Sequence, residues 1–353
     1  MTSLARAAAV IDQALGARAF SAAAAEVGRA SGALWQHAGG RLAFDDPRLV
    51  TMDTVFDVAS LTKVLATTTL AAEQVAAGDL DLDAPVSALS DYWREADRDS
   101  VTVRDLLEHA SGLPAYRPYY LTLSGRAAYE MAIASEPLDY APRTASLYSD
   151  LGFMLLGFIL EDRAGSALDA QFDRWRSREG IIAPLSYRTT SPWADLTAYT
   201  ENDPWRGRPL QGEVHDENAA ALGGVAAHAG LFGTAAGVGQ VARWWLSRLR
   251  GQAPATVTPV TPEIARRFVE RSRVPGSSRA LGWDTMLTRS SCGSHFSTHA
   301  VGHTGFTGTS LWIDPEQDLY AVLLTNRVHP TRANDAIKQV RRDFHDAVAG
   351  AGS

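Results

Sequence analysis

The sequence predicts an α+β fold whose sheet layer is built from both ends of the chain, with a mainly helical segment inserted between them. Helix and strand patterns alternate at the start, helical signals dominate residues 102–186, and strand character returns near the C-terminus. We therefore expect a sheet domain made of residues 1–80 and 215–353, a helical domain made of residues 81–214, and the active site between them.

Composition places the chain among ordinary globular proteins. Of its 353 residues 46% are hydrophobic and 21% are charged, and 33 Lys and Arg against 40 Asp and Glu give a net charge of −7. This mild acidity, without a run of Lys or Arg, argues against a nucleic-acid or membrane-surface binder. The single cysteine, Cys292, cannot form an internal disulfide and excludes a cysteine-rich zinc module.

Targeting and membrane-spanning segments are not predicted. The apolar run after Arg6 is interrupted by Asp12, which leaves it short of the roughly 7–15 unbroken apolar residues of a secretory signal. The longest apolar run elsewhere, residues 151–160, has about half the length of a membrane-spanning helix. We expect a soluble, cytoplasmic protein with no membrane partner.

The first predicted elements are a helix and a pair of strands. Residues 2–15 are rich in alanine and form the helix. Strand-like residues 31–37 and 41–44 flank Gly39 and Gly40, and this glycine pair predicts a hairpin turn.

Two helices with clear boundaries follow. Apolar residues recur at helical spacing from Leu61 to Val75, and Gly78 is placed to end that helix. Further on, Thr102 is a candidate N-cap with Asp105 at the third helical position, which predicts a short helix.

The middle of the chain contains another long helix and an irregular segment. The helix is predicted over residues 151–163 and stops at Gly165. Residues 185–217 contain three Pro, two Trp and little periodicity. Loops of this length are usually functional or disordered, and with two Trp we expect an ordered wall beside a cleft.

Strand patterns return in the C-terminal part. Residues 300–305, 310–313 and 319–325 predict an antiparallel hairpin or meander, with a turn at residues 314–318. An amphipathic helix over residues 334–348 follows.

Ser60 and Lys63 are the first candidates for chemistry. They lie at the start of the clearest helix, one turn apart on the same face. A serine hydroxyl becomes an effective nucleophile when a base takes its proton, and a lysine can do so if burial lowers its pKa. The alternative is an N-cap serine beside a solvated lysine, because Ser-x-x-Lys is common by chance.

Tyr148 and Asp150 are the second candidates, directly before the helix that starts at residue 151. The phenol of Tyr148 can act as a general acid or base where a nearby cation lowers its pKa, and Asp150 is placed to hold that cation. The alternative makes Asp150 a helix N-cap and Tyr148 a half-buried aromatic residue.

His303, Thr304 and Gly305 are the third candidates, inside a predicted strand that leads to Phe306. A glycine at a strand edge lets a ligand approach closely, and backbone N–H groups there can bind an oxyanion. The alternative is an ordinary strand that enters a glycine turn and contains a histidine with satisfied hydrogen bonds.

A zinc site is a rival interpretation of this region. His295, His299 and His303 recur every four residues, as zinc ligands on one helical face would. Gly293 and Gly302 disfavour a helix there, and in a strand residues four apart span too far to hold one ion. We expect no metal and no cofactor.

Taken in this order, the motifs resemble those of the serine β-lactamase and penicillin-binding-protein family, in its class C-like branch. That branch carries Ser-x-x-Lys, Tyr-x-Asn and Lys-Thr-Gly. Flanking segments extend the match at residues 56–63, 78–86, 106–114 and 229–235. The resemblance covers about residues 56–326. It implies a β-lactamase/transpeptidase-like fold, in which helices and a helical insertion domain flank an antiparallel sheet.

A narrower resemblance is to penicillin-binding-protein-like hydrolases and muropeptide amidases, which split peptide from N-acetylmuramic acid. It depends on residues 148–153, 214–219, 230–232 and 302–310. His215, Asp216 and His228 lie near glycine-rich loops in this part of the chain, where they either line the cleft or support the structure.

The resemblance implies acyl transfer with three catalytic residues, Ser60, Lys63 and Tyr148. Ser60 attacks the carbonyl carbon, while Lys63 and Tyr148 move its proton and later deliver one to the leaving group. The oxyanion is expected between the backbone N–H groups of Ser60 and Phe306. Water then releases the acyl group.

The implied substrate-binding residues are Asp150, His303, Thr304, Gly305 and Phe306. Asp150 stands where the family usually has Asn, so it keeps an acceptor but loses the amide donor. His303 stands in place of Lys, so a fixed positive charge becomes titratable. Both departures weaken the case for an efficient β-lactamase.

Several functions agree with this pattern. The leading one is a serine hydrolase that acts through an acyl-enzyme on peptidoglycan-derived amides, as a muropeptide amidase or a D-alanyl-D-alanine carboxypeptidase. The alternatives are a carboxylesterase or weak class C-like β-lactamase, and a slowly acylated penicillin-binding sensor. The complete set of Ser60, Lys63 and Tyr148 favours catalysis, since a pure binder does not need it. We expect a small-molecule or muropeptide substrate and no nucleic-acid partner, and the oligomeric state does not follow from the sequence.

The cleft is also a place for aromatic side chains that pack against a sugar or peptide. Trp193, Trp205 and Trp312 are the candidates for this role. The alternative is that they belong to the core.

Overall fold

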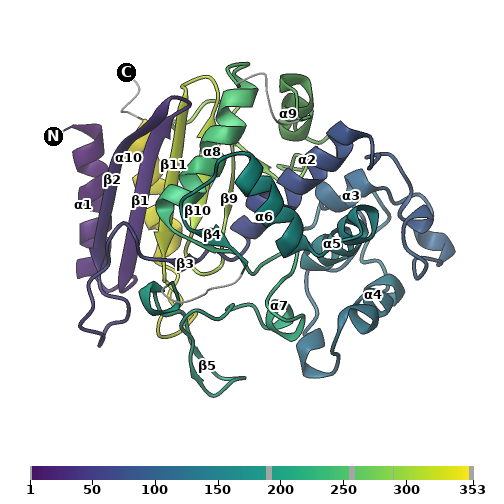
Figure 1. Ribbon diagram of the computed structural model, residues 1–353, viewed down its shortest axis with the longest axis horizontal. Helices are drawn as coiled ribbons and strands as arrows, with labels where there is room; N and C mark the ends of the chain where they lie inside the picture. Colours follow the sequence, from purple (N-terminus) through teal and green to yellow (C-terminus); the bar gives the residue numbers. More distant parts are fainter. Residues whose placement is uncertain (1, 188–192, 254–258, 289, 350–353) are drawn as a thin grey trace.

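A six-stranded antiparallel sheet forms one layer of the molecule, and its strands come from both ends of the chain (Figure 1). The computed structural model describes residues 2–187, 193–253, 259–288 and 290–349. The strand order is β2-β1-β11-β10-β9-β8, with β1 (Ala22–Arg29), β2 (Gly32–Gly40), β8 (Asp284–Thr285), β9 (Val301–Thr304), β10 (Ser310–Asp314) and β11 (Leu319–Thr325). The predicted α+β fold and C-terminal meander are confirmed.

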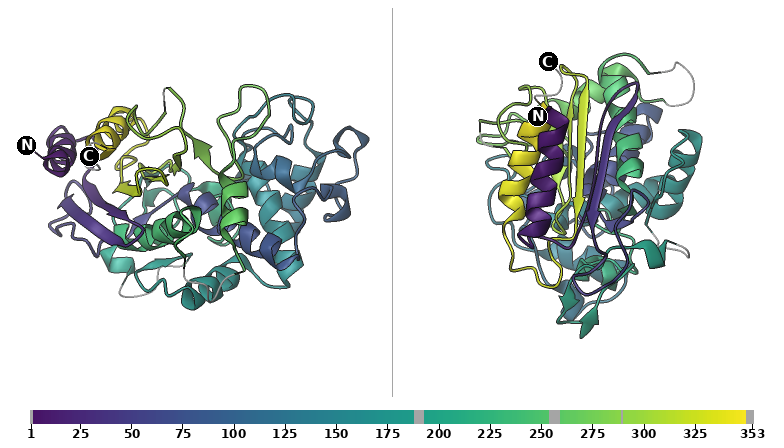
Figure 2. Two further views of the ribbon diagram at one scale, coloured as in Figure 1. Left: turned by 90° about the horizontal axis from the view of Figure 1, so that it is seen from above. Right: turned by 90° about the vertical axis from the view of Figure 1, so that its left-hand side faces the viewer.

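Helices cover both faces of this sheet. Figure 2 shows α1 (Ser3–Gly16) and α10 (Ile337–Ala349) on one face and α8 (Ala235–Leu249) on the other. Alternate residues of β1 follow this division, because successive side chains of a strand point to opposite faces. Ala23 and Ala25 pack in the core beneath α1 and α10, whereas Ala24 packs in the core shared with α8.

The first hairpin differs from the prediction. Its turn lies at residues 30–31, between β1 and β2, whereas Gly39 and Gly40 end β2 and pair with β1. The predicted turn at the glycine pair and the predicted strand over residues 41–44 are therefore wrong. Strand β1 was missed because its alanines have low strand propensity, and tertiary packing on both faces overrides that preference.

The remaining elements form the mainly helical part and several short strand pairs. The helices are α2 (Thr68–Ala77), α3 (Val103–Leu107), α4 (Arg126–Ser135), α5 (Asp150–Ala164), α6 (Leu168–Arg178), α7 (Glu217–Ala221) and α9 (Pro262–Val269). The short strands are β3 (Phe56–Asp57), β4 (Leu185–Ser186), β5 (Asn202–Asp203), β6 (Arg208–Pro209) and β7 (Phe232–Gly233). Single 3₁₀ turns occur at Val86–Ala88, Ala96–Arg98, Tyr119–Leu121 and Ala194–Leu196. Part of the predicted irregular segment, residues 188–192, lies outside the described residues.

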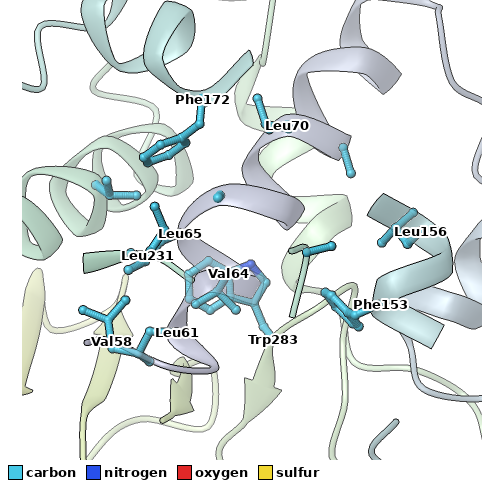
Figure 3. Close-up of a cluster of buried hydrophobic side chains, with 14 of the residues drawn as sticks. Val58, Leu61, Val64, Leu65, Leu70, Phe153, Leu156, Phe172, Leu231 and Trp283 are labelled. Carbon is cyan, nitrogen blue, oxygen red and sulfur yellow. The ribbon is translucent and has the colours of Figure 1, made fainter. Parts of the chain in front are cut away.

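The helix predicted from Leu61 is present but irregular. After its first residues it widens into a π-helix, Lys63–Thr67, and then continues as α2. Single π-helical turns are frequent at functional sites. Figure 3 shows that Leu61 and Val64 lie in a buried cluster with Phe153 of α5. This cluster fixes the start of the helix relative to α5.

Three predicted helix caps are present in the structure. Thr102 caps α3, and its capping box with Asp105 is complete. Gly78 ends α2 and Gly165 ends α5, as predicted. Among the helices of the described ranges, none has the length and the apolar run needed to cross a membrane.

Helix α5 approaches the segment before β7 closely at Gly157. A Cβ atom at this position would lie 2.5 Å from the Cβ of Ala227, and neither atom can move without its backbone. The neighbouring residue His228 contributes to the site described below, so this contact affects the spacing between two parts of the site.

We predict that Gly157→Ala lowers the free energy of unfolding by about 1–3 kcal/mol through overpacking. Gly152→Ala in the same helix is the matched control, because its Cβ would meet its nearest neighbours at 3.8 Å, an ordinary contact. We expect the control to retain or raise stability. Chemical denaturation of both variants measures this, and equal stability of the two would contradict the close approach.

Candidate active site

Ser60 follows a sharp turn at the end of β3. Ala59, the residue before it, has φ 48°, a left-handed conformation that is uncommon for a residue with a side chain. The N–H of Ala59 donates to Oδ1 of buried Asp57 at 2.8 Å, and the N–H of Val58 donates to the carbonyl of Leu231 at 3.0 Å. These bonds hold the turn, which brings Ser60 to the wall of a cavity.

The segment after β9 is fastened to the same turn. Thr307 Oγ1 donates to the carbonyl of Asp57 at 2.7 Å, and Thr309 Oγ1 donates to the carbonyl of Val58 at 2.9 Å. A Cβ atom on Gly305 would lie 2.5 Å from the carbonyl oxygen of Val58. Only glycine therefore lets the third motif lie against the turn that carries Ser60.

Lys63 is completely buried beside Ser60. Its Nζ donates to Ser60 Oγ at 3.2 Å and to the carbonyl of His228 at 3.0 Å, and it forms an ion pair with Asp150 Oδ1 at 2.7 Å. The alternative of a solvated lysine is therefore wrong. Burial lowers the pKa of Lys63, but the charge of Asp150 and the neighbouring Tyr148 raise it more, so its pKa lies above the ordinary value. The condition stated for Lys63 as a base, a pKa lowered by burial, is therefore not met in this arrangement.

Tyr148 has a buried hydroxyl that faces Ser60 and Lys63. Lys63 Nζ lies 4.8 Å from the centroid of the Tyr148 ring, and the His109 ring lies 4.7 Å from it on centroids. Burial raises the pKa of Tyr148 more than Lys63 and Ser60 lower it, so this pKa also lies above its ordinary value. The neighbouring cation, Lys63, is present as expected, but the pKa of Tyr148 is not lowered overall.

Ser149, not Asp150, is the N-cap of α5. Ser149 Oγ accepts from the N–H of Gly152 at 3.1 Å and donates to the carbonyl of Pro114 at 2.6 Å. The alternative that assigned the cap to Asp150 is wrong. Asp150 is the first helical residue, and its carboxylate is left to pair with Lys63.

His303 is neutral in this environment. It is 3% exposed, and its Nδ1 donates to the carbonyl of Thr304 at 2.9 Å, while Nε2 has no hydrogen-bond partner in the described part of the chain. Burial, together with the positive charges of Arg279 and Lys63, holds the pKa of His303 well below its ordinary value. The titratable positive charge expected here is therefore absent at neutral pH.

Ser60 and Phe306 both have free backbone N–H groups. Within residues 2–187, 193–253, 259–288 and 290–349, neither group donates a hydrogen bond. Arg327 Nε donates to the carbonyl of Phe306 at 2.8 Å, which restrains the following peptide. Both residues line the cavity, where such donors can stabilise negative charge on an oxygen atom.

The cavity has a volume of about 540 Å³ and brings most predicted site residues together. Its wall includes Ser60, Tyr148, Asp150, His303, Thr304, Gly305 and Phe306, whereas Lys63 lies behind it. The wall also includes residues that sequence reasoning missed, namely Tyr116, Glu217, Arg279, Asp284, Arg327, Arg332, Asp335, Lys338 and Arg341. They come from segments far apart in the chain, and no local pattern marks them.

The remaining candidates from the sequence are three polar residues between positions 215 and 228 and three tryptophans. His215 and Asp216 line the cavity, and His228 supports it from behind through its carbonyl and an ion pair with Asp216. None of Trp193, Trp205 and Trp312 lines the cavity.

The zinc alternative is not supported by the positions of its histidines. His295 pairs with Asp346 at 2.9 Å and His299 with Glu316 at 2.7 Å, while His303 faces the cavity. Within the described residues, no three His, Cys, Asp or Glu side chains are grouped to hold a metal ion.

Comparisons with known proteins show the family and the fold. The family model described as Beta-lactamase matches residues 7–345. The N-acetylmuramyl-L-alanine amidase of Bacillus subtilis is 32% identical over 306 residues, which cover 78% of this chain and 68% of that protein. A putative D-alanyl-D-alanine carboxypeptidase of Escherichia coli K12 is 29% identical over 325 residues, covering 82% and 73%. Among solved structures, EstCE1, a hydrolase with promiscuous acyltransferase activity, has a TM-score of 0.77 at 20% identity, covers 98% of each chain and shares the fold.

We predict that Asp150→Asn lowers the pKa of Lys63, because a cation that loses its anionic partner holds its proton less tightly. Ser60 can transfer its proton to Lys63 only when Lys63 is an amine. The rising limb of kcat/KM against pH should therefore move to lower pH, by about 1–3 units. Hydrolysis of an activated p-nitrophenyl ester across the alkaline range measures this shift.

Asp335→Asn is the control for that experiment. Asp335 lines the cavity but pairs with Lys338 at 2.8 Å, and its side chain is 67% exposed. The control should keep the wild-type pH profile. An unshifted limb in Asp150→Asn would show that Asp150 does not set the pKa of Lys63.

Proposed function

We propose that this chain, which belongs to the β-lactamase family and is a serine hydrolase, hydrolyses peptidoglycan-derived amides through an acyl-enzyme on Ser60. The observation that carries the proposal is the contact of 3.2 Å between buried Lys63 Nζ and Ser60 Oγ. A base within hydrogen-bond distance of a serine hydroxyl is what nucleophilic catalysis requires.

In the first half of the reaction, Ser60 Oγ bonds to the carbonyl carbon of the amide. Its proton passes to the amine form of Lys63, with Tyr148 bridging toward the leaving nitrogen. The carbonyl electron pair moves to oxygen, and the N–H groups of Ser60 and Phe306 stabilise that oxyanion. When the oxyanion collapses, the C–N bond breaks and the departing amine takes a proton by way of Tyr148.

In the second half, a water molecule attacks the ester that joins the acyl group to Ser60. Lys63 and Tyr148 accept the proton of the water and return one to Ser60 Oγ as the C–O bond breaks. The product is a free carboxylic acid. Asp150 keeps Lys63 beside Ser60 through both halves, by a hydrogen bond while Lys63 is an amine and by an ion pair once it is protonated.

The amide class is supported by the relatives. One that is 32% identical is named an N-acetylmuramyl-L-alanine amidase, and another at 29% a putative D-alanyl-D-alanine carboxypeptidase. The cavity of about 540 Å³ has the size of a small-molecule site, so one sugar or a short peptide fits it.

Ester hydrolysis is the second candidate. The neutral His303 provides no fixed cation at the third motif, which is compatible with uncharged acyl esters. Esters also have better leaving groups than amides, so the same groups can hydrolyse them.

We predict that a soluble muropeptide mixture is hydrolysed by the wild-type protein and not by Ser60→Ala, with turnover reduced by more than about 10³-fold. Mass spectrometry identifies the bond: release of the peptide from muramic acid establishes an amidase, and loss of a terminal D-alanine a carboxypeptidase. Ser135→Ala, on the exposed end of α4, is the control and should retain activity. An unchanged mixture, with Ser60-dependent cleavage of short-chain esters, would replace the amide proposal by the ester one.

A further inference from the structure

One arginine in the cavity wall has neither an ion pair nor a hydrogen bond to its side chain within the described residues. Arg327, Arg332, Lys338 and Arg341 bind carboxylates or backbone carbonyls. Arg279 also lines the cavity, yet over the described residues its guanidinium forms neither an ion pair nor a hydrogen bond. Arg279 differs in this respect from the other four cations named here.

Arg279 is held in position by its backbone. Its carbonyl accepts from the N–H of Ser272 at 2.7 Å, and it forms a bridge with Asp284. Its side chain is half-buried, with Cζ 5.1 Å from the centroid of the Tyr148 ring. The guanidinium is therefore presented to the cavity beside Tyr148.

The acidic residue that forms the backbone bridge with Arg279 has other side-chain partners. Asp284 also lines the cavity, but its Oδ1 accepts from Ser278 Oγ at 2.6 Å and from the N–H of Thr285 at 3.2 Å. A guanidinium that is partly removed from water and left unpaired costs free energy. Its planar set of N–H donors matches the two oxygens of a carboxylate. The cavity is thus prepared for an anion at Arg279.

His303 restricts where this anion can lie. Because Nδ1 donates to Thr304, the neutral ring presents the lone pair of Nε2, and this atom is buried without a partner in the described chain. A lone pair repels a carboxylate but accepts from an N–H or O–H group. An anion in this part of the cavity is therefore directed away from His303 and onto Arg279.

We propose that Arg279 binds a carboxylate carried by the departing half of the substrate. The inference rests on the proposed function, in which Tyr148 delivers a proton to the leaving nitrogen, so that the departing half lies beside Tyr148 and Arg279. The preferred substrates are then acyl derivatives whose leaving group is an amino acid or short peptide with a free carboxylate. Recognition of the anion comes from the loop between α9 and β8, and not from the residue at the third motif.

A pair of thioesters tests this assignment. N-acetylglycyl thioglycolate has a leaving group with a carboxylate, and its methyl ester differs only in lacking that charge. We expect the wild-type protein to prefer the carboxylate form about tenfold or more in kcat/KM, measured by thiol release. In Arg279→Gln the ratio should fall to about one, and in Arg279→Lys it should be intermediate, because lysine keeps the charge without the fork.

Arg273→Gln is the matched control, since Arg273 lies in the same loop and its side chain is 91% exposed. It should keep the wild-type ratio. A wild-type ratio near one, or a preference that persists in Arg279→Gln, would overturn the proposal.

Binding to Ser60→Ala separates this inference from the proposed function. Calorimetric titration of the two thioesters against this variant needs no turnover. Tighter binding of the carboxylate form, lost when Arg279→Gln is added, supports the role of Arg279 even if Ser60-dependent turnover is not found. Equal binding of the two forms overturns that role whatever the turnover.

Discussion

The burial of one positive charge is the constraint around which the site is built. Lys63 has no access to water, and a buried ammonium is tolerated only when it is paired and hydrogen-bonded. Its partners are the Asp150 carboxylate on α5 and the carbonyl of His228 before β7. The π-helix before α2, the start of α5 and the segment around residue 228 must therefore lie close together. The close contact between Gly157 and Ala227 packs α5 against the same segment.

The position of Ser60 depends on a second set of contacts. The left-handed conformation at Ala59 is unfavourable by about 1–3 kcal/mol, and such a residue persists only where the surrounding structure over-determines it. Here Asp57, Thr307 and Thr309 hold the turn by hydrogen bonds from two separate parts of the chain. The same bonds bring the backbone N–H of Phe306, which donates no hydrogen bond within the described residues, to the cavity wall that also contains the Ser60 hydroxyl.

The two departures from the family pattern change the charges in the cavity. An aspartate at position 150 gives Lys63 a full ion pair and raises its pKa, which favours the protonated resting state. A neutral His303 leaves the third motif without a cation, while Arg279, which has no ion pair within the described residues, lies beside Tyr148. The cation beside Tyr148 therefore comes from the loop between α9 and β8 and not from the third motif.

The fold class, the ends of five helices and the grouping of the three motifs could be predicted from the sequence, whereas α4, α6, α7, α8 and α9 were not delimited by it. The predicted features depend on local properties: hydrophobic periodicity, caps such as Thr102 and Gly165, and short-range spacing such as that of Ser60 and Lys63. The sequence did not determine β1, whose alanines become a strand only because helices cover both faces of the sheet.

The protonation states of the site and the presence of Arg279 in it depend on tertiary contacts. The pKa values of Lys63, Tyr148 and His303 depend on burial and on charges from distant segments, and these compete with opposite signs. Spacing along the chain carries no information on which effect is larger. For the same reason no local pattern distinguishes Arg279 from the exposed Arg273 in the same loop, because the difference lies in what the fold places beside each.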